Sequence, residues 1–227
     1  MSKGLSKEEL DSDILITIYA RLSVFLKENT TAMIAFTVLV LALIGGTVWY
    51  TVNSANQSEA AQSFLGYSEQ YMTSGDYESA LYGTDAILGV GLVSIVENYG
   101  RTDAGNLARY YAAVAFKELG DNDTALEYMR NFKAPEGILG VGAISFYAVL
   151  LDNAGLHQEA AREFRRAANW DKNEGTTPQN LLRAAQSALQ ADDYSQADQL
   201  AAEIIRDYPN AAQVTQAQRI AGMVAAR

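Results

Sequence analysis

The sequence predicts an all-α protein with a single N-terminal transmembrane helix, followed by about four stacked helical hairpins and a C-terminal capping helix. Three observations predict this fold. A long stretch near the N-terminus has no charged side chain, a phrase of small and turn-forming residues then occurs four times, and only three of the 227 residues are prolines. Scarce proline leaves helices uninterrupted, and a repeated short phrase is typical of stacked units that share one core.

The charge-free stretch runs from residue 29 to residue 58, and its centre reads AMIAFTVLVLALIGGTVWY at 32–50. About twenty apolar residues in a helix cross the hydrocarbon core of a bilayer. We therefore expect a transmembrane helix at 32–52, with Trp49 and Tyr50 at the membrane interface. A buried core helix is an alternative, but core helices are rarely as long and as uniformly apolar as this.

A cleaved signal peptide is a further alternative for this stretch. Signal peptides usually carry a shorter apolar run close to the N-terminus, whereas about thirty residues precede this longer run. Val52-Asn53-Ser54 could still serve as a cleavage site. We favour an uncleaved anchor, because its length fits a full span.

The basic residues predict the orientation of the span. Four of them precede it, and no lysine or arginine follows it until Arg101. The four are Lys3, Lys7, Arg21 and Lys27. Because basic residues stay on the cytoplasmic side, we expect segment 1–31 in the cytoplasm and the rest of the chain outside. In a bacterium this predicts a single-pass protein of the inner (cytoplasmic) membrane with a periplasmic repeat domain.

An amphipathic helix is predicted within segment 1–31. Leu15, Ile18, Leu22 and Phe25 fall on one helical face. This face could lie in the membrane interface or dock on a partner. A helical lead-in to the span with no separate role explains the same pattern.

The four similar phrases predict helical hairpins across residues 58–227. They align on a turn residue, with intervals of 45, 35 and 37 residues, and a small residue stands seven positions before each turn. Alanine stands five positions after every turn. The turn residues are Gly75, Gly120, Gly155 and Asp192; the small residues before them are Ser68, Ala113, Ala148 and Ala185; the alanines after them are Ala80, Ala125, Ala160 and Ala197. Glycine ends a helix in the left-handed conformation, and small residues let two helices approach closely.

The residues around the turns support the same interpretation. Asp76, Asp121 and Asp193 stand where the next helix begins, and their carboxylates suit its free N–H groups and its dipole. The long first interval carries extra residues. We interpret the glycines of ILGVG (87–91) and of GILGVG (137–142) as joints between repeats.

This pattern resembles the tetratricopeptide repeat family. Repeats two, three and four carry it well, and Pro209 stands where that family often has its closing proline. The stretch NWDKNEGTTP before repeat four reads as an extended loop. The resemblance implies a solenoid in which residues 210–227 cap the last repeat and the first helix of each hairpin lines a concave groove.

The groove predicted from helical spacing is largely apolar and has few cations. Its candidate residues are Leu65, Glu69, Met72, Tyr110, Val114, Lys117, Ser145, Val149, Asp152, Leu182, Gln186 and Leu189. Family members that clamp a C-terminal carboxylate use paired Lys, Arg and Asn, and this sequence lacks that set. An apolar groove instead suits extended or helical apolar segments of protein partners. Alternatively, several of these side chains only pack between repeats.

The composition argues against other classes of function. A formal net charge of −10 repels phosphate backbones, so we expect no nucleic-acid partner. The chain has no cysteine and one histidine, His157, whose place at a turn suits packing. No carboxylates converge for catalysis, and no cluster has metal-ligand spacing. We therefore predict no enzyme activity, no small-molecule substrate, no metal and no cofactor.

A narrower resemblance covers nearly the whole chain. A short cytoplasmic start, FLKEN before the span, an aromatic pair at its far end and degenerate repeats beyond it resemble the bacterial ancillary subunit of the SecYEG translocon. The phrase GNLARYYAAVAFKELGDNDTALEYMRNF carries this likeness best. It implies a membrane-anchored, chaperone-like helper for exported proteins, with translocon subunits and exported chains as partners. The alternative is a structural adaptor subunit of another cell-envelope or membrane complex.

Overall fold

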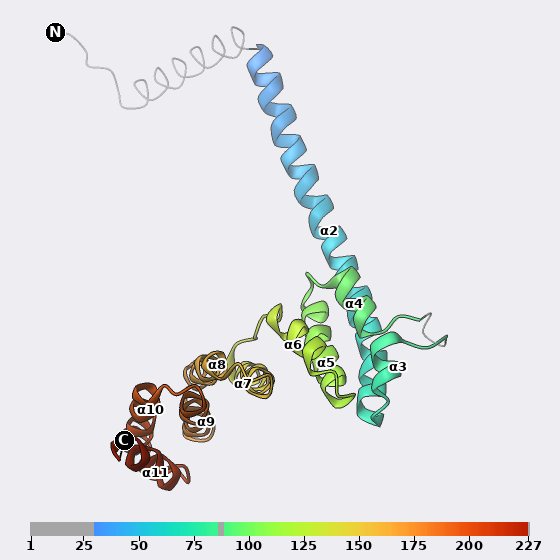
Figure 1. Ribbon diagram of the computed structural model, residues 1–227. Coiled ribbons are helices and arrows are strands. Elements are labelled where there is room, and N and C mark those ends of the chain that lie inside the picture. The colour runs from blue at the N-terminus through green and yellow to red at the C-terminus, as the bar shows by residue number, and fades with distance from the viewer. Residues whose placement is uncertain (1–29, 86–88, 227) are drawn as a thin grey trace, which may run out of the picture. The chain divides into compact units, whose positions relative to one another are not determined.

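The computed structural model describes residues 30–85 and 89–226 (Figure 1). Within these ranges the regular structure is helical and no β-strand occurs, which confirms the predicted fold class. The chain divides into two compact units, Met1–Asn56 and Gln57–Arg227. The amphipathic helix predicted within 1–31 falls on residues 1–29, outside the described part of the chain.

Helix α2 (Thr30–Ser74) begins with a segment long and apolar enough to cross a membrane. The most apolar window of this helix has a mean hydropathy of 2.0, and most large apolar side chains between Ile34 and Val52 are exposed. Leu43 is 64% exposed and Trp49 is 69% exposed. The sequence suggested a separate span ending near residue 52. The helix instead continues to Ser74, because residues 53–57 contain no glycine or proline to stop it.

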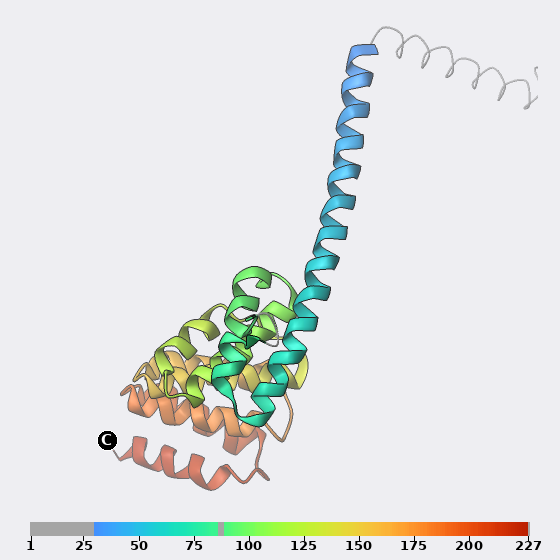
Figure 2. The same ribbon diagram turned by 90° about the vertical axis from the view of Figure 1, so that its right-hand side faces the viewer.

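The second unit consists of helical hairpins that follow the four predicted repeats (Figure 2). Residues 57–74 of α2 and the short α3 form the first hairpin, and a final helix packs on both helices of the fourth. The remaining helices are α3 (Tyr77–Tyr82), α4 (Leu92–Tyr99), α5 (Asp103–Glu118), α6 (Asn122–Arg130), α7 (Gly137–Asn153), α8 (His157–Trp170), α9 (Thr177–Gln190), α10 (Tyr194–Asp207) and α11 (Val214–Ala225). Helix α11 is the predicted cap.

The four turn residues all adopt the left-handed conformation. Their φ angles are 78° at Gly75, 87° at Gly120, 75° at Gly155 and 58° at Asp192. Each turn makes the same two backbone hydrogen bonds; at Gly120, for example, the N–H bonds the carbonyl of residue 117 and the next N–H bonds that of residue 116. These two hydrogen bonds end the helix and give its last carbonyl groups hydrogen-bond donors. The alignment of the four phrases is therefore confirmed at the level of backbone geometry.

Three of the four second helices begin with an aspartate cap. The carboxylates of Asp76 and Asp121 each accept a backbone N–H three residues on at 3.1 Å, and Asp193 does so at 2.9 Å. The pKa values of Asp76 and Asp121 are lowered, first by hydrogen bonds from the Ser79 and Thr124 side chains and then by these backbone bonds, because both stabilise the charged form. In the third repeat Leu156 holds this position and provides no side-chain cap.

The small residues predicted at helix contacts are fully buried. Ala80, Ala125, Ala160 and Ala197 are each 0% exposed, and so are the four small residues that precede the turns. Their bulkier neighbours, such as Leu151 and Phe164, belong to the same continuous core. The hairpins thus share one core, as stacked repeats must, since a single hairpin cannot bury its apolar face alone.

The first repeat departs from the others. Its second helix, α3, has six residues and ends at Gly83, where φ is 76°. A side chain at Gly83 or Gly91 would collide with the backbone of the facing segment of this loop, so both sites require glycine. The extra residues of the long first interval form α4, which packs on α3 and α5.

The two glycine-rich joints have different outcomes. Gly89 and Gly91 precede α4 and do lie in a connection. The second motif, 137–142, was expected to be a joint but forms the first turns of α7. Gly140 is needed there because a side chain would collide with the Pro135 carbonyl and the Trp170 ring.

Candidate partner-binding groove

A groove lies between the first helices of repeats three and four. There, α7 and α9 border an open cavity of about 560 Å³. Four of the predicted groove residues line it, namely Val149 and Asp152 from α7 and Gln186 and Leu189 from α9. Helical spacing had placed these four on the inner face, and the structure brings them together.

The walls of this cavity are more polar than the sequence suggested. Arg183 and Gln190 of α9 and the half-buried Asp152 of α7 join Val149 and Leu189 in the lining. The Asp152 carboxylate contacts Nδ1 of His157 at 2.9 Å. The Arg183 guanidinium lies 5.7 Å from the centre of the Phe164 ring, a cation–π distance. Opposite charges therefore stand at fixed positions beside apolar surface.

Two predicted groove residues contribute to packing only. Leu65 and Leu182 are each 4% exposed and belong to the shared core. A rotation of a helix by one residue position moves a side chain from the inner face to the core. Helical spacing alone could not predict this rotation. They are therefore left out of the candidate surface.

Ser145 connects two repeats. Its hydroxyl lies 2.7 Å from two acceptors, the carbonyl of Val141 and Oδ1 of Asn180, and donates its one hydrogen to either of them. Asn180 is buried on α9 and donates to the carbonyl of Thr176. Ser145 thus links α7 to α9 through the bond to Asn180.

Tyr110 lies in an aromatic cluster where repeats two and three meet. Its ring centre is 5.7 Å from that of Phe146 on α7, 5.8 Å from that of Phe132 and 5.9 Å from that of Tyr111. Such spacings stabilise aromatic pairs. Burial raises the pKa of the Tyr110 hydroxyl, because the anionic form would lose hydration. Tyr110 is half-buried, so part of its surface is available to a partner at this junction.

The first and second repeats meet near Glu69. The pKa of Tyr111 on α5 is raised, chiefly by burial and further by the Glu69 carboxylate, which accepts its hydrogen bond. Met72 and Val114 are half-buried, and Met72 packs against the shared core. This part of the predicted groove is therefore partly occupied by contacts between repeats.

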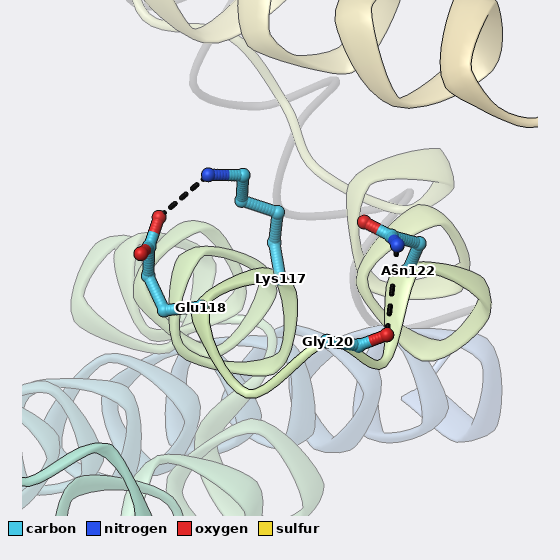
Figure 3. A network of polar contacts seen from close by, with 4 residues as sticks. All are labelled: Lys117, Glu118, Gly120 and Asn122. Carbon is cyan, nitrogen blue, oxygen red and sulfur yellow. Dashed lines mark hydrogen bonds and ion pairs between the residues drawn. The ribbon is translucent and has the colours of Figure 1, made fainter.

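Lys117 is paired within its own helix. Figure 3 shows its ammonium group reaching the Glu118 carboxylate, at 2.6 Å, beside the Gly120 turn. Asn122 Nδ2 reaches the Gly120 carbonyl at 3.5 Å on the other side of this turn. Because both charges of the pair are over a third exposed, it stabilises the fold little, and Lys117 remains accessible.

Sequence reasoning missed Arg183 and Gln190. Both lie on the same face of α9 as Gln186, three and four residues away, so helical spacing could have found them. Among the described residues, no group of three or more His, Asp or Glu side chains could hold a metal ion.

Comparison with known proteins agrees with this architecture. The tetratricopeptide repeat family model matches residues 107–134 and 179–211, which are repeats two and four. No curated protein matches the sequence.

The fold is similar to a crystal structure of nearly identical TPR-like repeats, from a protein of Podosopora anserina described as a kinesin light chain. The identity is 12%, the TM-score is 0.52, and 74% of this chain aligns with 86% of that one. A single-substitution variant of the same protein aligns equally well, over 85% of its length. At this identity the likeness concerns the fold alone. The chain therefore carries tetratricopeptide repeats, which indicate a scaffold for protein–protein interaction.

Proposed function

We propose that this protein is a single-span membrane protein whose repeats hold other proteins in the groove between α7 and α9. The observation that carries the proposal is the cavity of about 560 Å³, in which Val149, Leu189, Asp152 and Arg183 face one space. A partner segment can bury apolar side chains there and pair its polar groups at the edges.

The membrane part of the proposal rests on α2 and on the basic residues. The apolar segment of α2 has the length and composition of a span. The absence of lysine and arginine between it and Arg101 favours a cytoplasmic N-terminus and repeats on the outer side. In a bacterium the protein would lie in the inner membrane with a periplasmic repeat domain.

Within this frame we favour an ancillary translocon subunit that assists exported proteins. The support is the resemblance of the span, its flanks and the repeats to that family, noted above. Chains that emerge from a translocon are unfolded and diverse, so such a helper should bind many segments weakly.

A structural adaptor of another envelope complex is the second candidate, and one observation favours it. The groove carries Asp152, Arg183, Gln186 and Gln190 beside three apolar residues, Val149, Phe164 and Leu189. Charges and amides at fixed positions favour binding of one partner with matching groups and disfavour binding of others.

Photo-crosslinking in living cells separates these candidates. A crosslinker at Val149 or Gln186 should give a ladder of secreted proteins together with translocon subunits if the protein is a helper. One discrete band would instead favour the adaptor. The control position is the exposed Ala202 on α10, which lies outside the groove lining. Equal products at Ala202 and Val149, or none at Val149 and Gln186, would contradict the groove as the working surface.

The topology is tested separately. A phosphatase that is active only outside the cytoplasm, fused after Arg227, should be active in cells. Activity of a cytoplasmic reporter at the same position would reverse the proposed orientation without affecting the groove.

A further inference from the structure

A second cleft lies at the junction of repeats two and three, away from the α7–α9 groove. Two adjoining cavities of about 870 and 500 Å³ share Gly100, Arg101, Arg109 and Lys133. We call this region, with the exposed Leu107 and Leu139 that also line it, the junction cleft. Its walls are α4 and the turn before α5, one face of α5, α6 with the α6–α7 connection, and the first turn of α7.

Three cations converge on the junction cleft in a strongly acidic chain. Within the described ranges, none of Arg101, Arg109 and Lys133 forms an ion pair with a carboxylate within 4.0 Å. Asp103 and Glu127 also line the two cavities, one in each. The cleft therefore presents more positive than negative groups, whereas the chain as a whole carries −10.

The scaffold holds the Arg109 guanidinium and the backbone of Lys133 in place. The Arg109 guanidinium donates to the Gly100 carbonyl at 2.6 Å, and a side chain at Gly100 would collide with the carbonyl of Val96 and with Arg109 itself. Asn106 on α5 holds the backbone of Lys133 with two bonds, donating to its carbonyl at 2.8 Å and accepting from its N–H at 2.9 Å. A preorganised site loses less entropy on binding.

Apolar surface lies directly beside the cations. Leu139 is 75% exposed and Leu107 is 37% exposed, and Phe132 and Pro135 line the same cavity. Burying this exposed apolar surface of Leu139 against a partner would be favourable. The combination of three cations and an apolar wall complements a segment that carries carboxylates next to apolar side chains.

We propose that the junction cleft binds an acidic, apolar segment of a partner protein. Carboxylates of the segment pair with Arg101, Arg109 and Lys133, and an apolar side chain between them packs on Leu107 and Leu139. An anionic membrane surface is the less suitable occupant, because the net charge of −10 repels such a surface as a whole. This site goes beyond the proposed groove, since it shares no lining residue with the α7–α9 cavity.

The test is fluorescence anisotropy with the full-length protein in detergent micelles. The probe is a short labelled peptide in which glutamate and leucine alternate. The native protein should bind it, and added salt should weaken binding. Peptides with glutamine in place of glutamate, or serine in place of leucine, should each bind at least about tenfold more weakly, since each lacks one half of the recognition.

Matched variants locate the site. Arg101→Glu with Lys133→Glu should weaken binding at least about tenfold, whereas Arg165→Glu, at an exposed cation of α8, should not. Leu139→Asn should weaken binding, whereas the same change at its exposed neighbour Ile138, which does not line the cleft, should leave it unchanged. All these positions are exposed, so circular dichroism should show unchanged folding.

Several outcomes would overturn the proposal. These are no binding by the native protein, equal binding of the serine and leucine peptides, and undiminished binding by the Arg101→Glu, Lys133→Glu variant. Binding to vesicles of phosphatidylglycerol without binding to the peptide would assign the cleft to a lipid surface instead. Loss of peptide binding in a Gln186→Glu variant, at an exposed residue of the groove lining, would place the peptide in the α7–α9 groove. Crosslinking at Val149 and Gln186 tests that groove independently.

Discussion

The first part of α2 and the part of α7 after its first turn are both apolar, yet they place most of their large side chains in opposite environments. In α2, Leu43 is 64% exposed; in α7, Leu151 is 1% exposed. At 17 residues α7 is too short to cross a bilayer, whereas α2 is long enough. Two helices of similar composition therefore lie in different surroundings. Helix α7 packs in the protein interior, and we propose that the first part of α2 lies in lipid.

The glycines of the two helices explain part of the difference. In α7, Gly140 allows the Pro135 carbonyl and the Trp170 ring to approach, and Trp170 Nε1 donates to that carbonyl at 2.8 Å. In α2, no atom of the described residues lies within 4 Å of a side chain built at Gly45 or Gly46. A small residue in α7 thus serves a contact with a neighbouring helix. Those in α2 meet no neighbour in the described part of this chain.

The largest effect is expected from charges placed in α2. Leu41→Arg with Ile44→Arg should prevent stable insertion, because each arginine costs roughly 3 kcal/mol at the centre of a spanning helix. The measurement is the fraction of protein that remains in membranes after alkaline carbonate extraction. The matched control places two arginines, with the same spacing, at Gln199 and Ala202 of α10, where both side chains are exposed. If the α2 variant stayed in the membrane fraction as the control does, the first part of α2 would not lie in the lipid bilayer.

The second-largest effect is expected when a leucine is changed to alanine, and it should occur in α7 and not in the first part of α2. Leu151→Ala should lower the free energy of unfolding of the repeats by about 2–5 kcal/mol, because it leaves a cavity in the core. Leu43→Ala should change it by less than about 0.5 kcal/mol, because the Leu43 side chain is exposed. Urea denaturation of the full chain in micelles, followed by circular dichroism, measures both. Equal losses would mean that α2 and the repeats unfold as one unit.

Overpacking at a helix contact should have a smaller effect. Ala197→Leu on α10 should destabilise the repeats by about 1–3 kcal/mol, because Ala197 is fully buried between helices. Ala202→Leu on the same helix is the matched control, since Ala202 is exposed and leucine is a good helix former. Thermal melts compare the two. Indistinguishable melting temperatures would argue against close helix contacts at the repeated alanine.

Some features of the repeats could be predicted from the sequence and others could not. The turns and the buried alanines follow from local chemistry, since left-handed φ angles and aspartate caps are encoded within a few residues, and they were predicted correctly. The short α3 and the added α4 were not, because Gly83 and Gly91 act through a close approach across a loop.

The candidate surfaces were harder to predict. Spacing placed Val149 and Leu189 on the groove, but it also placed Leu65 and Leu182 there, and these two are buried. The difference is a small rotation of each helix, which packing with its neighbours decides. The junction cleft was missed entirely, because Arg109 and Lys133 come together only through the path of the α6–α7 connection.

The smallest effect is expected at the fourth turn, where an aspartate takes the place of glycine. Asp192 has a φ of 58°, and no other non-glycine residue described in the structure has a positive φ. A side chain in this conformation costs up to about 1–2 kcal/mol, and less for aspartate than for most residues. Asp192→Gly should relieve this cost, although glycine gains more freedom in the unfolded chain. The Tyr194 hydroxyl also donates to the Asp192 carboxylate, and glycine would lose that bond.

The turn can therefore be tested in a background that lacks this bond. Asp192→Gly in the Tyr194→Phe protein should raise the free energy of unfolding by up to about 1 kcal/mol. The reciprocal change, Gly155→Asp at the equivalent turn of repeat three, should lower it by about the same amount. Both changes act on a turn of the repeats, so carbonate extraction should find membrane insertion through α2 unchanged. If Asp192→Gly lowered stability even without the Tyr194 hydroxyl, strain at this turn would not explain the preference for glycine at the other three.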